Sequence, residues 1–268
     1  MGNELLLSSG EIGELCAAMG CGPPFLLSRS VAGRVRSARG EVREVPSAIR
    51  GSLRVLAEPD VAVTVHARVA GAARYVFIAT RGSEAALHQP LPGDLHRIGV
   101  VDPGGVPSLA LDTAGLDDRP SAGAIRFTVA AADLRVASDR AGVGRIEDAA
   151  MALRGAGVTA VEAAARFASA LGRVEAVASV TILRWRTPAR ADGVTVGWLD
   201  SGAGGLWRIE GPNLATGSDA GGLAPGAWYD TPATVSAVTA DEVRALVTAG
   251  IGAACEAETG LGRSSEAR

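Results

Sequence analysis

The stretch that decides the fold is residues 159–211, TAVEAAARFASALGRVEAVASVTILRWRTPARADGVTVGWLDSGAGGLWRIEG. Its first part carries apolar residues at helical spacing: Ala164, Phe167, Ala168 and Leu171. Two segments rich in β-branched residues follow, and the second alternates apolar and polar positions through Val194, Val196 and Trp198. A glycine-rich segment then precedes residues 206–209, Leu-Trp-Arg-Ile. The stretch therefore predicts a helix, two strands, a turn and a third strand.

The predicted turn is residues 200–205, Asp-Ser-Gly-Ala-Gly-Gly. A chain that reverses between twisted strands places residues at positive φ, which glycine tolerates because it has no Cβ. An Asp at a strand end commonly accepts hydrogen bonds from its own turn, and we assign Asp200 this role. Asp200 is also the best lone carboxylate for catalysis, and that alternative stays open.

The same order of elements occurs earlier in the chain. Residues 48–88 predict a helix that ends before Pro59 and then three strands, of which 61–69 has the period-2 alternation of a half-buried strand; residues 95–101 predict a fourth. We therefore predict an α+β fold built from two related halves, each with an antiparallel meander, whose two sheets could join edge to edge. Its related helix-plus-meander halves are 1–101 and 125–258, joined by a linker rich in Pro, Gly and Asp over 102–124 and followed by a frayed tail, 259–268.

Three capping boxes mark predicted helix starts, since each pairs a hydroxyl residue with a Glu three positions later. The pairs are Ser8 with Glu11, Thr159 with Glu162, and Thr239 with Glu242. Residues 125–129 predict a further strand and residues 146–153 a further helix. Residues 25–27 predict a short strand, 30–44 a solvated helix or loop, and 211–226 a flexible glycine-rich segment.

Composition narrows the class of protein. A net charge of −3 and a pI near 5.7 do not favour nucleic acid or an anionic membrane as a partner. All basic residues are Arg, which is typical of GC-rich genomes such as those of actinobacteria. Because the sequence shows neither a signal peptide nor a long apolar run, we expect a cytoplasmic protein without membrane insertion. Cys16, Cys21 and Cys255 lack metal-site spacing, and we expect Cys16 to pack as a small hydrophobe.

Local motifs for catalysis or cofactor binding are absent from the sequence. The three histidines, His66, His88 and His96, are scattered, and only Asp94 lies near the last two as a carboxylate. The glycines of 202–205 lie between strands and open no helix that could hold a phosphate. We therefore expect no metal and no cofactor. The main alternative is an enzyme whose site assembles in space around Asp200 and His66.

Three segments resemble the EspG family of proteins associated with type VII (ESX) secretion. They are residues 52–63, SLRVLAEPDVAV, followed by paired strands; residues 197–201, GWLDS, leading through Gly205 to Trp207-Arg208; and residues 238–242, VTADE, at the start of the closing helix. The order of elements is similar along nearly the whole chain. This resemblance implies one α+β domain over 1–268 with pseudo-twofold symmetry and a central antiparallel β-sheet flanked by helices. It also implies a chaperone in the cytosol that binds the apolar helical tip of PE/PPE substrates, masks it and presents them to the secretion machine.

The resemblance also implies a partner-binding surface. It would include the short reversal between two strands, Ala70, Gly71, Ala72 and Ala73, with the flanking Arg68 and Arg74, and the closing helix at Val243, Leu246 and Val247. The three apolar residues of that helix, considered alone, fit core packing better. The glycine-rich segment 219–226 is another candidate contact. A structural or oligomerising module, including a weak homodimer, is a further alternative.

Overall fold

The computed structural model describes residues 4–22, 24, 46–187, 190–211 and 231–259. Four expectations lie outside these residues: the short strand at 25–27, the segment 30–44, the glycine-rich segment after residue 211, and the tail after residue 259.

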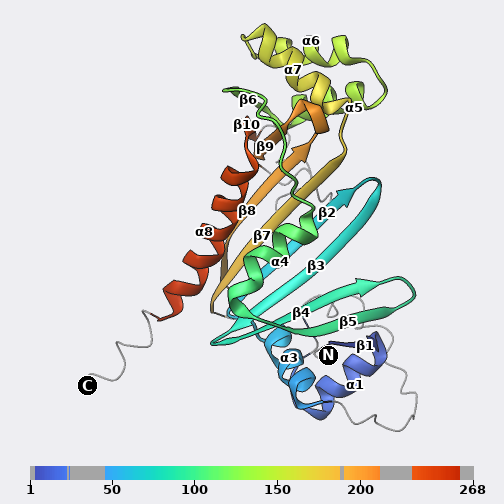
Figure 1. The fold of residues 1–268 in the computed structure, drawn as a ribbon, viewed down its shortest axis with the longest axis vertical. Helices are drawn as coiled ribbons and strands as arrows, with labels where there is room; N and C mark the ends of the chain where they lie inside the picture. Colours follow the sequence, from blue (N-terminus) through green and yellow to red (C-terminus); the bar gives the residue numbers. More distant parts are fainter. Residues whose placement is uncertain (1–3, 23, 25–45, 188–189, 212–230, 260–268) are drawn as a thin grey trace.

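Within the described residues, ten strands form one antiparallel sheet in the order β1-β5-β4-β3-β2-β7-β8-β9-β10-β6 (Figure 1). The strands are β1 Glu4–Ser8, β2 Val61–Val69, β3 Ala72–Arg81, β4 Glu84–Leu91, β5 Leu95–Val101, β6 Arg126–Ala130, β7 Ala176–Thr187, β8 Arg190–Asp200, β9 Leu206–Glu210 and β10 Pro232–Val238. The helices are α1 Ser9–Ala18, α3 Ser47–Ala57, α4 Val106–Ala114, α5 Ala131–Gly142, α6 Ile146–Gly155, α7 Val161–Leu171 and α8 Ala240–Thr259.

The two halves repeat one order of elements, as the sequence predicts. The first half runs β1, α1, α3, β2 to β5, α4, and the second runs β6, α5, α6, α7, β7 to β10, α8. The halves meet where β2 pairs with β7, in an antiparallel register of nine residue pairs from Val61–Arg184 to Val69–Ala176. The pseudo-twofold α+β fold is therefore confirmed, with one sheet continuous through both halves.

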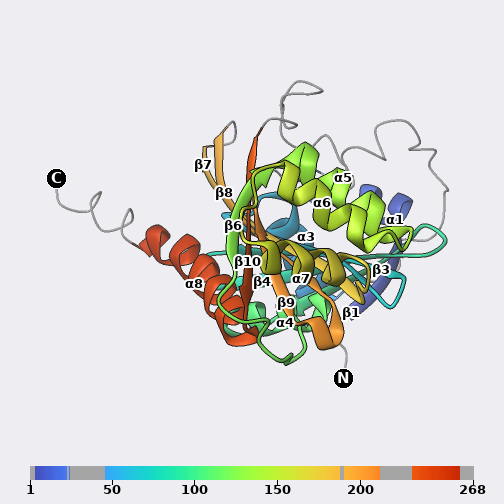
Figure 2. The same cartoon turned by 90° about the horizontal axis from the view of Figure 1, so that it is seen from above.

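The two faces of the sheet carry different helices (Figures 1 and 2). On one face, α4 and α8 cover a core built from alternating residues of the central strands, such as Val63, Val180 and Trp198. On the other face, α1 and α3 cover one end around Phe77, and α5, α6 and α7 cover the other end around Trp207. We call this last layer, residues 131–171, the helical end. Trp198 and Trp207 both lie in cores, but on opposite faces of the sheet.

The expected linker at 102–124 contains helix α4, and the prediction of an irregular segment is wrong there. Pro107 stands in the first turn of α4, where its missing N–H breaks no helical hydrogen bond. Val106, Ala110 and Ala114 recur every four residues and are completely buried, while Gly115 ends the helix in the left-handed conformation with φ of 65°. The helix packs on β2 and β3, so it completes the first half.

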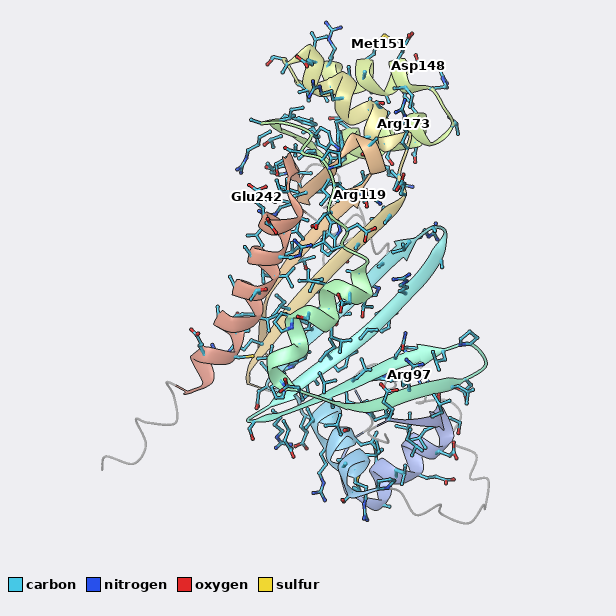
Figure 3. The ribbon with its side chains drawn as sticks, in the orientation of Figure 1. Arg97, Arg119, Asp148, Met151, Arg173 and Glu242 are labelled. Carbon is cyan, nitrogen blue, oxygen red and sulfur yellow. The ribbon has the colours of Figure 1, made fainter. Side chains whose placement is uncertain are left out.

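The connection from α4 to β6 is held to the second half at several points. Arg119 is the main anchor: its Nε lies 2.9 Å from Asp200 Oδ2, and its Nη2 lies 3.0 Å from Glu175 Oε2 (Figure 3). Asp118 accepts a 2.7 Å bond from Arg244 of α8, and Arg166 of α7 donates to the carbonyl of Ala122 at 3.1 Å. These bonds tie the connection to three different elements.

The glycine-rich turn has the role predicted for it, with a tighter constraint. Asp200 accepts a bond of 2.7 Å from the amide of Gly202, which confirms its role in the turn. Gly205 has φ of 82°, and a Cβ at this position would lie 2.8 Å from the carbonyl oxygen of Pro120. Glycine is therefore required here both by conformation and because the α4–β6 connection passes directly over the turn.

Two of the three predicted capping boxes form. Ser8 with Glu11 and Thr239 with Glu242 make the reciprocal bonds. The third prediction is wrong: α7 begins one residue later, with Ala160 as its N-cap and no side-chain cap, so the hydroxyl of Thr159 stands outside the capping position.

Candidate partner-binding surface

The β2–β3 reversal is the part of the predicted site that the structure exposes. Ala70 and Gly71 both have positive φ, 49° and 80°, and Val69 pairs directly with Ala72. This is the two-residue hairpin turn that matches the twist of the flanking strands. The exposed residues are Arg68, Ala70, Gly71, Ala72, Ala73 and Arg74. The reversal therefore offers small side chains and main chain between two arginines.

The two arginines of the reversal point to opposite faces of the sheet. Arg68 pairs with Ala73, whereas Arg74 pairs with Ala67, a residue of the core beneath α4. Successive side chains of a strand alternate between faces, so these pairings place the guanidinium groups on opposite sides. Arg74 lies beside Gly115 at the carboxyl end of α4, where a cation is favourable. The pair therefore brackets the reversal.

The closing helix does not join the reversal. Val243 and Val247 of α8 have no exposed surface and pack in the core beneath α8, and Leu246 is partly buried against the same core. Figure 1 shows α8 and the reversal on opposite sides of the molecule. Two apolar side chains that are already buried inside the chain are not available to a partner, so this part of the predicted site is corrected.

The structure instead brings the reversal beside the helical end. The amide of Ala70 donates to the carbonyl of Glu175, 3.1 Å away, in the connection from α7 to β7. Val174 in this connection is exposed. Beyond it, the helical end exposes further large apolar side chains, namely Val136, Val143, Met151 and Val161. The exposure of these residues cannot be predicted from the sequence. An apolar residue in a helical segment is assigned to the core by default, and only the fold shows whether other residues cover it.

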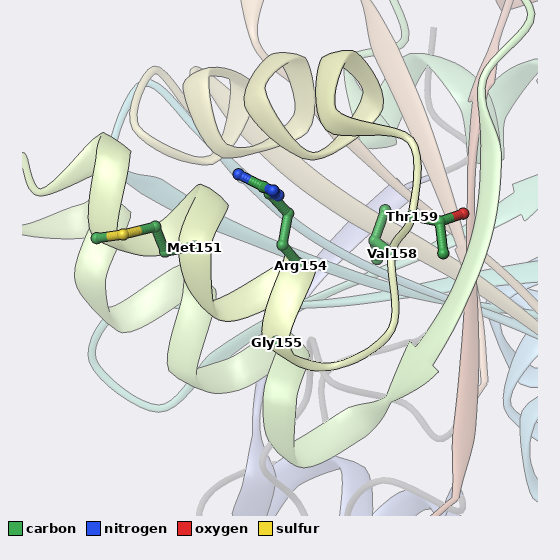
Figure 4. Close-up of a pocket in the computed structure, with 5 residues that line it drawn as sticks. All are labelled: Met151, Arg154, Gly155, Val158 and Thr159. Atoms are coloured by element: carbon green, nitrogen blue, oxygen red, sulfur yellow. The ribbon is translucent and has the colours of Figure 1, made fainter.

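A pocket opens on the helical end between α6 and the α6–α7 connection (Figure 4). It has a volume of about 460 Å³ and is lined by Met151, Arg154, Gly155, Val158 and Thr159. Met151 is 58% exposed, while Val158 is buried at the base of the loop. Methionine adapts its shape to different apolar partners. The surface formed by the reversal, Val174 and the helical end is the candidate partner-binding surface.

Two of the three histidines come together elsewhere, beneath α1. His88 Nε2 lies 2.9 Å from His96 Nδ1, His96 Nε2 lies 2.8 Å from Ser9 Oγ, and Ser9 donates to Asp94 Oδ1 at 2.5 Å. His88 is completely buried, and its Nδ1 has no hydrogen-bond partner among the residues that the structure describes. Since Ser9 gives its proton to Asp94, His96 Nε2 donates to Ser9 and His88 Nε2 donates to His96. His88 Nδ1 then carries an unpaired lone pair, whose burial costs less free energy than burial of an unpaired N–H.

Burial favours the neutral form of both imidazoles. Burial, and then the charge of His96, lower the pKa of His88 to about 4. Burial also lowers the pKa of His96, although Asp94 opposes that shift. Because Ser9 donates to a carboxylate, its hydroxyl is not poised to give a proton to His96 as a nucleophile would be. These hydrogen bonds link the start of α1 to β4, β5 and the turn between them.

The alternative enzyme site does not find support in these contacts. The carboxylate of Asp200 is occupied by Arg119 and by the turn amide of Gly202. His66 instead lies edge-on to Tyr75, with ring centroids 4.4 Å apart, and burial lowers its pKa. Among the residues that the structure describes, no group of His, Cys, Asp and Glu has the arrangement needed to hold a metal ion. In the same part of the chain, none of the helices combines the length and the apolar character needed to cross a membrane.

Comparison with known proteins shows that the fold of this chain is similar to that of a solved structure. No protein-family model and no curated protein matches the chain. Among solved structures, the chain is similar to the Mycobacterium tuberculosis type VII secretion system chaperone EspG5, whose structure was determined in complex with a PE25-PPE41 dimer. The alignment covers 92% of this chain and 95% of EspG5, with a TM-score of 0.57 and 14% sequence identity. The resemblance predicted from the sequence is therefore confirmed in three dimensions: this chain has the fold of an EspG chaperone.

Proposed function

We propose that this protein is an EspG-like chaperone of the cytosol that binds the apolar helical tip of a PE/PPE-type substrate and delivers it to a type VII secretion system. The observation that carries the proposal is the fold shared with EspG5 over 92% of this chain. That neighbour is itself bound to a PE–PPE dimer, which supports a partner of the same kind here. The proposed activity is binding, so it needs neither catalysis nor a cofactor.

The candidate surface has the chemistry that such a partner requires. An apolar helix tip is prone to aggregation until other apolar side chains cover it. Exposed Met151, Val143 and Val174 can supply such cover, and the small residues of the β2–β3 reversal allow main chain to approach closely. Leu246 remains a secondary candidate on α8. We propose that the substrate tip lies against the reversal and the helical end.

Co-expression tests the function. Each PE/PPE pair encoded in the source genome is produced together with the tagged chaperone, and the complex is isolated by affinity and size-exclusion chromatography. We expect one pair to elute with the chaperone in a stable, soluble complex. If none of the endogenous pairs does so, the proposal is refuted.

Surface variants test the site separately from the function. Met151→Asp and the double charge reversal Arg68→Glu/Arg74→Glu should each weaken substrate binding by about tenfold or more, since about 1.4 kcal/mol corresponds to tenfold. Exposed Arg54 on α3, at the other end of the molecule, provides a control as Arg54→Glu. Binding is measured by biolayer interferometry, with thermal melting to verify folding. Equal affinity in all variants would remove this surface while leaving the chaperone function intact.

A further inference from the structure

Helix α1 ends in a motif that brings two cysteines into contact. The amide of Cys21 donates to the carbonyl of Cys16 at 3.0 Å, and the amide of Gly20 donates to Ala17 at 3.1 Å. Gly20 has φ of 67°. This is the Schellman motif, in which the third residue before the cap and the second residue after it pack against each other. Here these two positions are occupied by Cys16 and Cys21.

The same motif elsewhere in the chain carries aliphatic pairs. Helix α4 ends with the amide of Leu116 bonded to the carbonyl of Leu111, and α6 ends with Val158 bonded to Leu153. The four residues belong to, or pack against, hydrophobic cores. The packing at such a helix end therefore needs only apolar side chains. Two thiols at the corresponding positions of α1 add a chemistry that packing does not require.

The two thiols differ in access. Cys16 is 1% exposed, within the core shared by α1 and α3, whereas Cys21 is partly exposed. The thiol of Cys21 lies 3.6 Å from the carbonyl oxygen of Cys16. Burial, and then the neighbouring Cys21 with its charge and hydrogen bond, raise the pKa of Cys16 to about 12. An oxidant from solvent therefore reaches Cys21 first.

We propose that Cys16 and Cys21 form a peroxide-sensitive dithiol that closes to an intramolecular disulfide. In the first step the Cys21 thiol attacks one oxygen of hydrogen peroxide, the O–O bond breaks, and Cys21 becomes a sulfenic acid with release of one water. In the second step the sulfur of Cys16 attacks the sulfur of Cys21, the S–O bond breaks, and a second water leaves. The peroxide is reduced to two waters and the two thiols are oxidised to one disulfide.

The second step is helped by the first. Conversion of Cys21 to an uncharged sulfenic acid removes the thiol group that adds to the high pKa of Cys16, although burial, the larger cause, still raises that pKa. The closed disulfide links the last turn of α1 to the residue two positions beyond its cap. Since the crosslink also restricts the unfolded chain, we expect the oxidised protein to melt at a higher temperature than the reduced protein.

Mass spectrometry of the whole protein tests this proposal. The protein is treated with hydrogen peroxide, alkylated under denaturing conditions and digested with trypsin. Arg29 is the first basic residue, so both cysteines fall in one peptide, and Cys255 falls in a different one. We expect the first peptide to lose both alkylation sites and the mass of two hydrogen atoms, while Cys255 is still alkylated.

Two variants make the result decisive. In Cys16→Ala, which keeps the core position apolar, Cys21 cannot be resolved, and dimedone should trap several-fold more sulfenic acid than in the wild type. In Cys21→Ala, Cys16 should stay reduced and be alkylated after denaturation. The proposal is overturned if the wild type retains both alkylated thiols, if Cys21 accumulates sulfinic acid without a disulfide, or if the crosslink joins two chains.

Discussion

Removing the Arg119 guanidinium should destabilise the protein far more than removing an ordinary surface arginine. The single N–H of Arg119 Nε is shared between both carboxylate oxygens of Asp200, at 2.9 and 3.1 Å, and Asp200 is 2% exposed. In Arg119→Ala the carboxylate stays buried and, within the described part of the chain, keeps only the 2.7 Å hydrogen bond from the Gly202 amide. Losing one member of a buried pair costs about 3–5 kcal/mol because the other charge is left uncompensated.

The partial exposure of Arg119 makes the expected loss of stability smaller than that of a fully buried pair. Its side chain is 27% exposed, so water can partly replace it, and an exposed pair contributes only about 0.2–1 kcal/mol. We therefore expect Arg119→Ala to lower the free energy of unfolding by about 2–3 kcal/mol. For a chain of this size that corresponds to a decrease in Tm of roughly 5–10 °C.

Arg81→Ala provides the matched control. Arg81 pairs with Glu58 at 2.8 Å, nearly the same separation, but both side chains are well exposed. Urea unfolding followed by tryptophan fluorescence measures both variants. The double variant Arg119→Ala/Asp200→Asn should recover part of the loss, since it no longer buries a charge. Equal effects of Arg119→Ala and Arg81→Ala, or no recovery in the double variant, would refute the reasoning.

Three further predictions concern single features of the fold. His88 has a pKa of about 4 in the folded protein against 6.5 in the unfolded chain. The unfolded chain therefore binds more protons between these pH values, so the free energy of unfolding should fall by about 2 kcal/mol from about pH 7 to about pH 5. Urea unfolding measures this change, and His88→Leu should largely remove it. Gly205→Ala should lower Tm more than Gly157→Ala, because both glycines have positive φ but only Gly205 has main chain within reach of the new Cβ. Thr239→Ala should cost about 1 kcal/mol through loss of its helix cap, and Thr159→Ala close to nothing, by the same unfolding measurement.

The sequence predicts the sheet well because its strands alternate strictly or carry dense β-branched residues. Strands 61–69 and 95–101 lie where the pattern indicates, and so does the 200–205 turn. Short elements escape the same reasoning. Helix α4 has only a stripe of small buried residues within a segment rich in Pro, Gly and Asp, and β1 is five residues long and runs directly into α1. Such elements are stabilised by their contacts with the sheet: α4 packs on β2 and β3, and β1 pairs with β5.

The candidate surface is harder to predict than the fold because it depends on which apolar residues the core leaves uncovered. Val243 and Met151 both occupy helices, yet one is completely buried and the other is 58% exposed. The Arg119–Asp200 pair spans 81 residues of sequence and has no local pattern. Contacts of this kind follow from the way the two halves pack, which periodicity does not encode.

The β2–β7 pairing also bears on the origin of the chain. Separated from its partner, either half would expose an edge strand of nine or more residues with Val61, Val63 and Val65 or Val180 and Ile182 on its apolar face. Such an edge pairs readily with another chain. If the halves descend from one duplicated unit, the ancestral unit would therefore have been a homodimer joined through this strand, and gene fusion would have turned an interface between two molecules into the centre of one.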